Sequence, residues 1–146
     1  MSASPEEISP DEPSERTLPE VRAEAAALLA KADRALAAAR LALTVDDTET
    51  AVSRLYYAAF YAARAALLPL GESAKTHAGV LTRFRARFEH TGRLPAGVAR
   101  TLAYAFSARV RTDYEAFTVF DVGAATDLQA DVAAFVATVR ALDETA

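Results

Sequence analysis

Apolar side chains recur at intervals of three and four residues along most of the chain, and this spacing constrains the fold more than any other feature. Such a period places one apolar stripe on an α-helix, and no stretch alternates convincingly as a β-strand does. Short connections between the periodic segments favour antiparallel neighbours. The sequence therefore predicts an all-α fold, an up-and-down bundle of four to five helices. The segments cover roughly residues 17–43, 46–68, 73–91, 95–114 and 123–142.

Capping signals predict where several of these helices begin and end. Thr17-Leu-Pro-Glu20 forms a capping box, and Asp46-Asp-Thr-Glu49 offers a second one. Pro69-Leu-Gly71 is expected to stop the second helix, because proline cannot continue a helix and glycine favours its C-terminus. The third helix is expected to begin near Ser73 or Lys75.

The N-terminal residues have a different composition from the rest. Residues 1–16 hold three prolines among serine and acidic residues and have little to bury, so we expect a disordered acidic tail. Residues 17–146 are expected to form one helical domain, since a chain of 146 residues usually makes a single core.

Several classes of protein are disfavoured by what the sequence omits. It has no cysteine, which excludes disulfides and thiolate chemistry and is compatible with a reducing cytoplasm, where we expect the protein. No window offers about 18 uninterrupted apolar residues, so no membrane span is expected. The acidic N-terminus does not resemble a signal peptide. No metal-binding cluster, glycine-rich phosphate loop or catalytic triad pattern is present, and we expect neither a metal nor a cofactor.

The net charge of −4 conceals a strong asymmetry along the chain. Residues 1–20 carry six acidic residues against Arg16, whereas residues 54–111 carry ten basic residues against two acidic ones. One hypothesis is a basic face that binds RNA or phosphate. The other is an arginine-rich solvated surface, and the composition does not decide between them.

Two motifs stand out from the helical pattern. The first is Ala51-Val-Ser-Arg-Leu-Tyr-Tyr-Ala-Ala-Phe-Tyr-Ala-Ala-Arg64, and the second is Arg109-Val-Arg-Thr-Asp113-Tyr114. Together with Lys75-Thr-His77 and the Phe84 to Gly92 region between them, they resemble the HEPN family. The likeness is to the branch with Ser-Arg-x-Tyr-Tyr-Ala-x-Phe and Arg-x-x-x-Asp-Tyr motifs, and it covers about residues 20–142.

The resemblance implies an all-helical domain from a prokaryotic toxin–antitoxin or defence locus. Active HEPN domains carry an arginine followed, after four to six residues, by a histidine, and two copies meet in a dimer that cleaves RNA without metal. An imidazole can accept the proton of a ribose 2′-hydroxyl, and a guanidinium can stabilise charge on phosphoryl oxygens. This branch is paired with minimal nucleotidyltransferases. The resemblance thus implies a homodimer and a nucleotidyltransferase antitoxin as partners.

The sequence departs from the active-site pattern at the expected histidine. The positions allowed after Arg109 hold Tyr114, Glu115 and Ala116. By spacing alone, Arg109 and Asp113 could be an ordinary surface ion pair on one helix face. With the resemblance, Arg109, Asp113 and Tyr114 become candidate catalytic residues.

His77 is the candidate to replace the missing histidine. It lies near the expected start of the third helix, where an anion is favoured, and Lys75 is close in sequence. It could serve as a phosphate ligand or a substitute base, or simply cap or pack. A second candidate pair, Arg85 and His90, satisfies the count of four intervening residues, but on the third helix.

The adjacent tyrosines cannot share a face, because neighbours on a helix point about 100° apart. Tyr56 fits the apolar stripe, whereas Tyr57, with Arg54 and Tyr61, is expected to form a polar-aromatic face that stacks a base or seals a dimer. The candidate phosphate- or RNA-binding residues are Lys75, Arg54, Tyr57 and Arg111.

Three functional hypotheses remain at the level of sequence. The first is a HEPN toxin that acts as a metal-independent endoribonuclease. The second is a non-catalytic HEPN module that binds nucleotide or RNA, or docks a minimal nucleotidyltransferase. The third is an unrelated helical interaction bundle. Because the expected histidine is absent, the sequence leaves open whether the protein is an enzyme.

Overall fold

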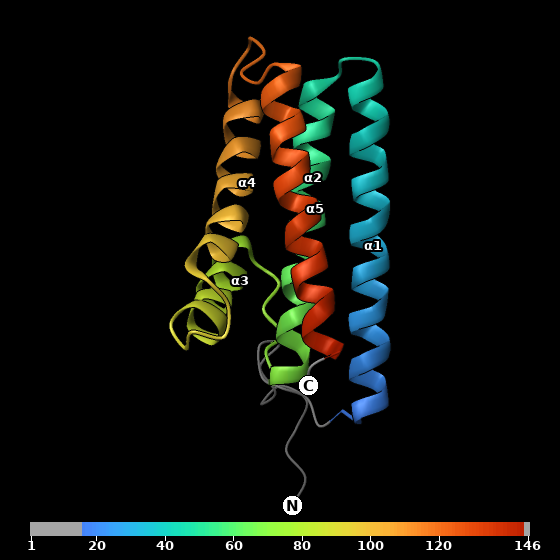
Figure 1. Cartoon of the computed structure of the whole chain (residues 1–146), viewed down its shortest axis with the longest axis vertical. Coiled ribbons are helices and arrows are strands. Elements are labelled where there is room, and N and C mark those ends of the chain that lie inside the picture. The colour runs from blue at the N-terminus through green and yellow to red at the C-terminus, as the bar shows by residue number, and fades with distance from the viewer. Residues whose placement is uncertain (1–15, 145–146) are drawn as a thin grey trace, which may run out of the picture.

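Four long helices and one short helix make up the fold. The structure is a computed structural model and describes residues 16–144. Figure 1 shows the four long helices running alternately up and down, with the short α3 beside the lower part of α4. No strand occurs in the described range, so the predicted all-α up-and-down bundle is confirmed. The helices are α1 (Leu18–Thr44), α2 (Thr48–Leu67), α3 (His77–Phe84), α4 (Ala96–Tyr114) and α5 (Val122–Glu144).

The first two helices form an antiparallel hairpin whose ends are set by side-chain caps. The predicted capping box of α1 is confirmed: Glu20 N donates to Thr17 Oγ1 at 3.2 Å, and Thr17 N donates to Glu20 Oε2 at 3.2 Å. The second predicted box is wrong in detail. Asp47 caps α2 by accepting from Thr50 N at 3.1 Å, whereas Asp46 lies in the turn with a φ of 58°.

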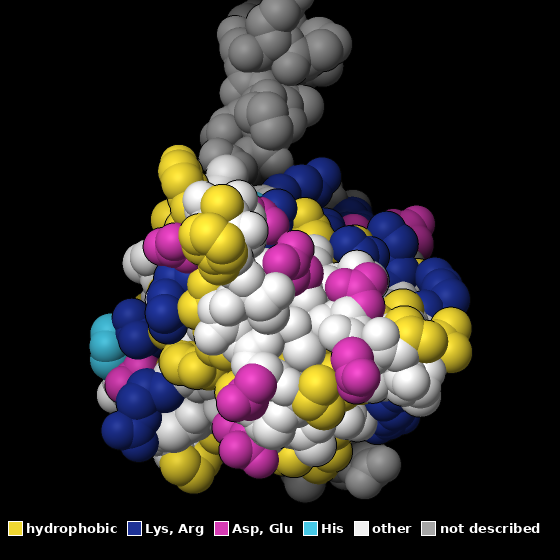
Figure 2. All heavy atoms as spheres, turned by 90° about the horizontal axis from the view of Figure 1, so that it is seen from above, with side chains coloured by type: hydrophobic (Ala, Val, Ile, Leu, Met, Phe, Trp, Pro, Cys, Tyr) yellow, Lys and Arg dark blue, Asp and Glu magenta, His cyan; other side chains and the backbone are white. Residues whose placement is uncertain are grey.

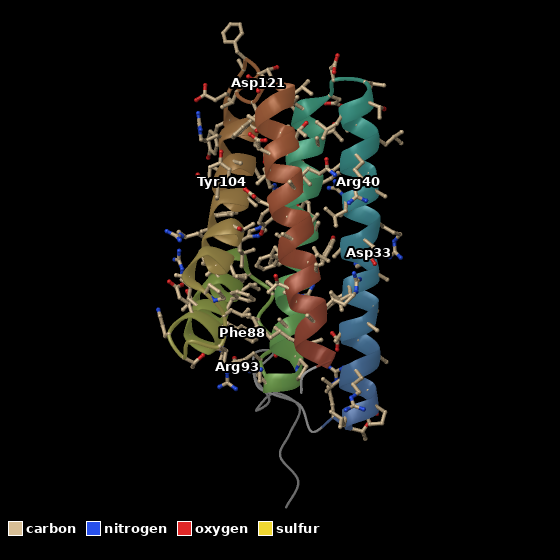
Figure 3. All side chains as sticks on the ribbon, in the orientation of Figure 1. Asp33, Arg40, Phe88, Arg93, Tyr104 and Asp121 are labelled. Carbon is tan, nitrogen blue, oxygen red and sulfur yellow. The ribbon has the colours of Figure 1, made fainter. Side chains whose placement is uncertain are left out.

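The chain reverses at the lower end of the bundle as predicted. A 3₁₀ turn, η2 (Leu68–Leu70), follows α2, and Gly71 adopts a φ of 80°, which glycine tolerates without a Cβ clash. After α3 the chain continues into a π-helical segment, η3 (Arg85–Glu89), which the sequence did not predict. The guanidinium of Arg93 then lies 5.1 Å from the ring centroid of Phe88, and both residues lie near this end of the bundle (Figure 3).

The core is built around α2, which packs against α1, α4 and α5. The predicted inner face of this helix is confirmed, since every residue assigned to it is buried. Full burial of a leucine or phenylalanine side chain contributes about 1.5–3 kcal/mol, so this face stabilises much of the bundle. Its members are Val52, Leu55, Tyr56, Ala59, Phe60, Ala63, Ala66 and Leu67.

The α5 helix is both long and apolar. Within residues 16–144, α5 is the one helix that is long and apolar enough to cross a membrane by length and composition, with a hydropathy of 1.2 over Val122–Leu142. About 33% of this apolar window is buried inside the bundle, and the buried part is a stripe that packs against the other helices. That stripe contains Leu128, Val132, Phe135, Val136 and Val139.

A candidate phosphate-binding cluster between α2, α3 and α4

Two neighbouring tyrosines on α2 form the base of the cluster. Tyr56 is 1% exposed and belongs to the core, as predicted. Tyr57 points in a different direction and is only half-buried. The guanidinium carbon of Arg54 lies 4.8 Å from the centroid of the Tyr57 ring, one helical turn back. This arrangement attracts the cation to the negative face of the phenol ring.

Arg54, Tyr57 and Tyr61 lie together, as predicted for a polar-aromatic face: the Tyr57 and Tyr61 ring centroids are 5.9 Å apart, and Arg54 lies over the Tyr57 ring. Tyr61 is half-buried, and Lys31 from α1 places its Nζ 5.1 Å from the Tyr61 ring centroid. The α1 helix therefore covers Tyr61 within one molecule. Tyr57 and Tyr61 are both half-buried, which leaves part of each ring available to a base or a partner.

His77 enters the cluster as the first residue of α3. The hydroxyl of Thr76 accepts from Gly79 N at 3.0 Å and thereby fixes where the helix begins. This start is later than the Ser73 or Lys75 predicted. A Cβ on residue 79 would lie only 2.7 Å from Thr76 Oγ1, so glycine is needed for the cap to approach.

The imidazole of His77 is surrounded by aromatic rings. Its centroid lies 5.1 Å from Phe106 in a stacked arrangement and 5.1 Å from Phe60. The hydroxyl of Tyr56 hydrogen-bonds to His77 Nδ1. Three contacts from two helices thus hold one imidazole ring in place.

Arg109 reaches the same cluster from α4. Its guanidinium carbon lies 5.3 Å from the Tyr56 ring centroid and 4.9 Å from that of Tyr57. Its Nε lies 3.4 Å from Asp113 Oδ2, which confirms that these two residues share a face. Because His77 and Arg109 both contact Tyr56, the structure brings an imidazole and a guanidinium together from positions 32 residues apart in sequence.

The protonation of His77 is affected by this environment. Desolvation among the aromatic rings, and secondarily the positive charge of Arg109, lower the pKa of His77 below its ordinary value. Both causes favour the neutral imidazole. Near pH 7 the cluster therefore combines a neutral imidazole with a permanent cation.

Other predicted site residues lie outside this cluster. Lys75 is exposed in the loop before α3, and Tyr114, the last residue of α4, is 86% exposed. Arg111 points elsewhere on α4, with its guanidinium carbon 5.6 Å from the Phe120 ring centroid. The alternative pair is not joined through its side chains, since Arg85 Nε contacts Glu89 at 3.3 Å and His90 is exposed.

A shallow groove of about 510 Å³ lies beside the cluster, between the first half of α2 and the end of α4. Arg54 is its one cationic lining residue, against three acidic ones. Figure 2 views this end of the bundle and shows acidic side chains spread across it, with basic side chains toward the rim. The groove is lined by Glu49, Thr50, Ser53, Arg54, Thr112, Asp113 and Glu115.

The contribution of Tyr56 to the cluster was not predicted from the sequence. Its place in an apolar stripe indicated a core residue, which is correct, but a buried phenol also needs a hydrogen-bond partner. The sequence therefore indicates that Tyr56 needs a hydrogen-bond partner, but it does not indicate that the partner is His77. Within the described residues, no group of three or more histidine and acidic side chains is placed to hold a metal ion.

Comparison with known proteins defines the family. A model of the HEPN domain matches residues 25–142, which is most of the chain. The chain belongs to the HEPN family. A UPF0332 protein of Gloeobacter violaceus is 40% identical to this HEPN domain over 87 residues, covering 60% of this chain and 69% of that protein.

Two archaeal relatives carry a name that refers to function. Both come from Methanocaldococcus jannaschii and are named "Putative toxin". One is 34% identical over 89 residues, covering 61% of this chain and 60% of its own length. The other is 33% identical over 95 residues, covering 65% of this chain and 71% of its own length. This HEPN domain therefore has toxin-like relatives.

Proposed function

We propose that this protein is the HEPN toxin component of a toxin–antitoxin or defence system and acts on RNA as a metal-independent endoribonuclease. The proposal is supported by membership of the HEPN family and by the relatives named as toxins. The observation that carries it is the placement of His77 beside Arg109, through their shared contacts with Tyr56. An imidazole from α3 thus lies beside an arginine of α4, whereas positions 114–116, where the family pattern has the histidine, carry none.

The chemistry of the cluster suits a phosphodiester. The planar guanidinium of Arg109 can donate two parallel hydrogen bonds to phosphoryl oxygens and stabilise the charge that develops there. Tyr57 offers a half-buried aromatic face on which a base can stack. Arg54 adds a second cation at the edge of the groove.

The test is RNA cleavage with a chelator present, together with growth arrest on expression. We expect cleavage by the wild type and its loss in Arg109→Ala and His77→Ala. The matched controls Arg85→Ala and His90→Ala should cleave normally. If cleavage survived the first two substitutions and failed in the controls, the site would lie at η3 instead.

A second candidate is a non-catalytic HEPN module that binds nucleotide or RNA, or docks a minimal nucleotidyltransferase. It is favoured by the absence of histidine at Tyr114, Glu115 and Ala116 and by exposed aromatic side chains at the end of α4, where Tyr114 and Phe117 are 86% and 87% exposed. Calorimetric titration with a purified minimal nucleotidyltransferase tests it. Tight binding without RNA cleavage by any variant would favour this candidate.

A further inference from the structure

Tyr56 is a buried residue whose hydroxyl has one hydrogen-bond partner among residues 16–144. The Tyr56 side chain is 1% exposed, and its ring packs against Phe60 at 5.7 Å and Phe106 at 5.5 Å between centroids. In the described part of the chain, Nδ1 of His77 is the only hydrogen-bond partner of this hydroxyl. Because a buried phenol cannot hydrogen-bond to bulk water, the Tyr56 hydroxyl depends on the hydrogen bond to His77.

This contact determines which nitrogen of His77 carries the proton. The phenol has one hydrogen to donate and, among the described residues, no acceptor other than Nδ1, so Nδ1 is the acceptor. A neutral imidazole with an unprotonated Nδ1 carries its hydrogen on Nε2. The other tautomer would leave the buried phenol hydrogen unpaired, a penalty that corresponds to about a 5- to 150-fold preference for Nε2–H.

The surroundings hold the ring in that state. Phe60 and Phe106 pack against the imidazole, and the charged group that faces it from α4 is Arg109. A nearby cation disfavours a second proton on the ring. Because Nδ1 is engaged with Tyr56 and the His77 side chain is partly exposed, Nε2–H is the group left for a ligand.

We propose that Tyr56 is a positioning residue that holds His77 as the Nε2–H tautomer. The cluster then presents two hydrogen-bond donors to an RNA phosphodiester, which are His77 Nε2–H and the Arg109 guanidinium. In this tautomer the imidazole does not act as a base. The inference rests on the proposed function for the identity of the ligand, but not for the tautomer. His77 then binds phosphoryl oxygen and does not accept the 2′-hydroxyl proton. In this respect it differs from the histidine that the family pattern implies.

The tautomer is tested directly by long-range ¹H–¹⁵N correlation spectra of the full, untagged chain. The protein has only two histidines, and His90→Gln assigns the remaining ring to His77. Above the ordinary histidine pKa of about 6.5, we expect a protonated Nε2 and an unprotonated Nδ1 in the wild type. A protonated Nδ1 in the wild type would overturn the proposal.

Tyr56→Phe tests the cause while keeping the aromatic ring. The Nδ1–H fraction of His77 should rise, and its pKa should rise too, because the lost hydrogen bond had stabilised the neutral form. Tyr57→Phe is the matched control, since its ring also lies against Arg109, whereas the hydrogen bond to His77 comes from the Tyr56 hydroxyl. An unchanged His77 spectrum in Tyr56→Phe would show that Tyr56 does not position the ring.

The donor role is tested with RNA. His77→Gln keeps an N–H donor near the position of Nε2 but cannot act as a base at neutral pH, whereas His77→Phe keeps only the bulk. We expect His77→Gln to retain affinity for a short, fluorescein-labelled single-stranded RNA within about threefold, and His77→Phe to lose roughly tenfold or more, as for a lost hydrogen bond to a charged group.

The outcomes separate the two proposals. Full RNA affinity in His77→Gln together with complete loss of cleavage would identify His77 as a base and overturn the donor role. If the wild type neither bound nor cleaved RNA, the proposed function would fail. The spectra would then still decide the tautomer and the role of Tyr56.

Discussion

Arg109→Ala should abolish RNA cleavage while leaving the bundle folded, and the structure allows both effects to be estimated. The guanidinium lies over two tyrosine rings and pairs with Asp113, whose side chain is 56% exposed. A cation–π contact at a partly exposed site contributes about 0.5–1 kcal/mol, and a helical ion pair a few tenths. The substitution should therefore lower the free energy of unfolding by only about 1–2.5 kcal/mol, against the 5–15 kcal/mol typical of a domain.

The functional effect should be much larger than this loss of stability implies. Removing one group that stabilises charge in the transition state typically lowers the turnover rate by about 10²- to 10³-fold. Arg109→Lys should restore little of the rate, because a single ammonium cannot reproduce a planar two-point contact with a phosphate. At room temperature most of each variant remains folded, so the rate reports the site and not the fold.

The assay is single-turnover RNA cleavage in the presence of a chelator, with thermal unfolding followed by circular dichroism. Arg111→Ala is the matched control, because it removes the same side chain from the same helix and loses a cation–π contact with Phe120. We expect this control to cleave at nearly the wild-type rate. Cleavage by Arg109→Ala within about threefold of wild type, or an equal loss in Arg111→Ala, would refute the assignment of Arg109.

Three further predictions follow from individual contacts and from the sequence. Lowering the pH through about 6.5, the pKa of an unfolded histidine, should lower the melting temperature of the wild type more than that of His77→Phe. The reason is that the pKa of His77 is lowered in the folded state, so the unfolded chain binds a proton more readily. Equal slopes of melting temperature against pH in the two proteins would contradict this. Gly79→Ala should cost about 0.5–2 kcal/mol in chemical denaturation by displacing the Thr76 cap, with Ala78→Gly as a comparison that leaves the cap intact. Light scattering at tens of micromolar should show a homodimer, and a mass of only 15.5 kDa would contradict it.

Most of the fold could be predicted because local physical chemistry determines it. The apolar stripes gave the helices, and the Thr17 box and the Pro69 to Gly71 stop gave two ends that the structure confirms. The errors lie where alternatives are close in sequence. By residue type, Asp46 and Asp47 are equally good N-caps. Asp46 adopts a φ of 58° in the turn, and Asp47 is therefore the residue that caps α2. The tail predicted over residues 1–16 lies outside the described residues except for Arg16.

The candidate site could be predicted only in part, because its essential contacts join distant segments. The pairing of Arg109 with Asp113 follows from helix geometry, and the structure confirms it. The contact between Tyr56 and His77 spans 21 positions and depends on how the loop before α3 returns to α2. From the sequence, His77 could be a phosphate ligand, a substitute base, or a capping or packing residue. The buried phenol of Tyr56 beside it favours the first of these, a ligand that donates a hydrogen bond from Nε2. The role of this histidine is therefore set by a neighbour that helical periodicity assigns to the core.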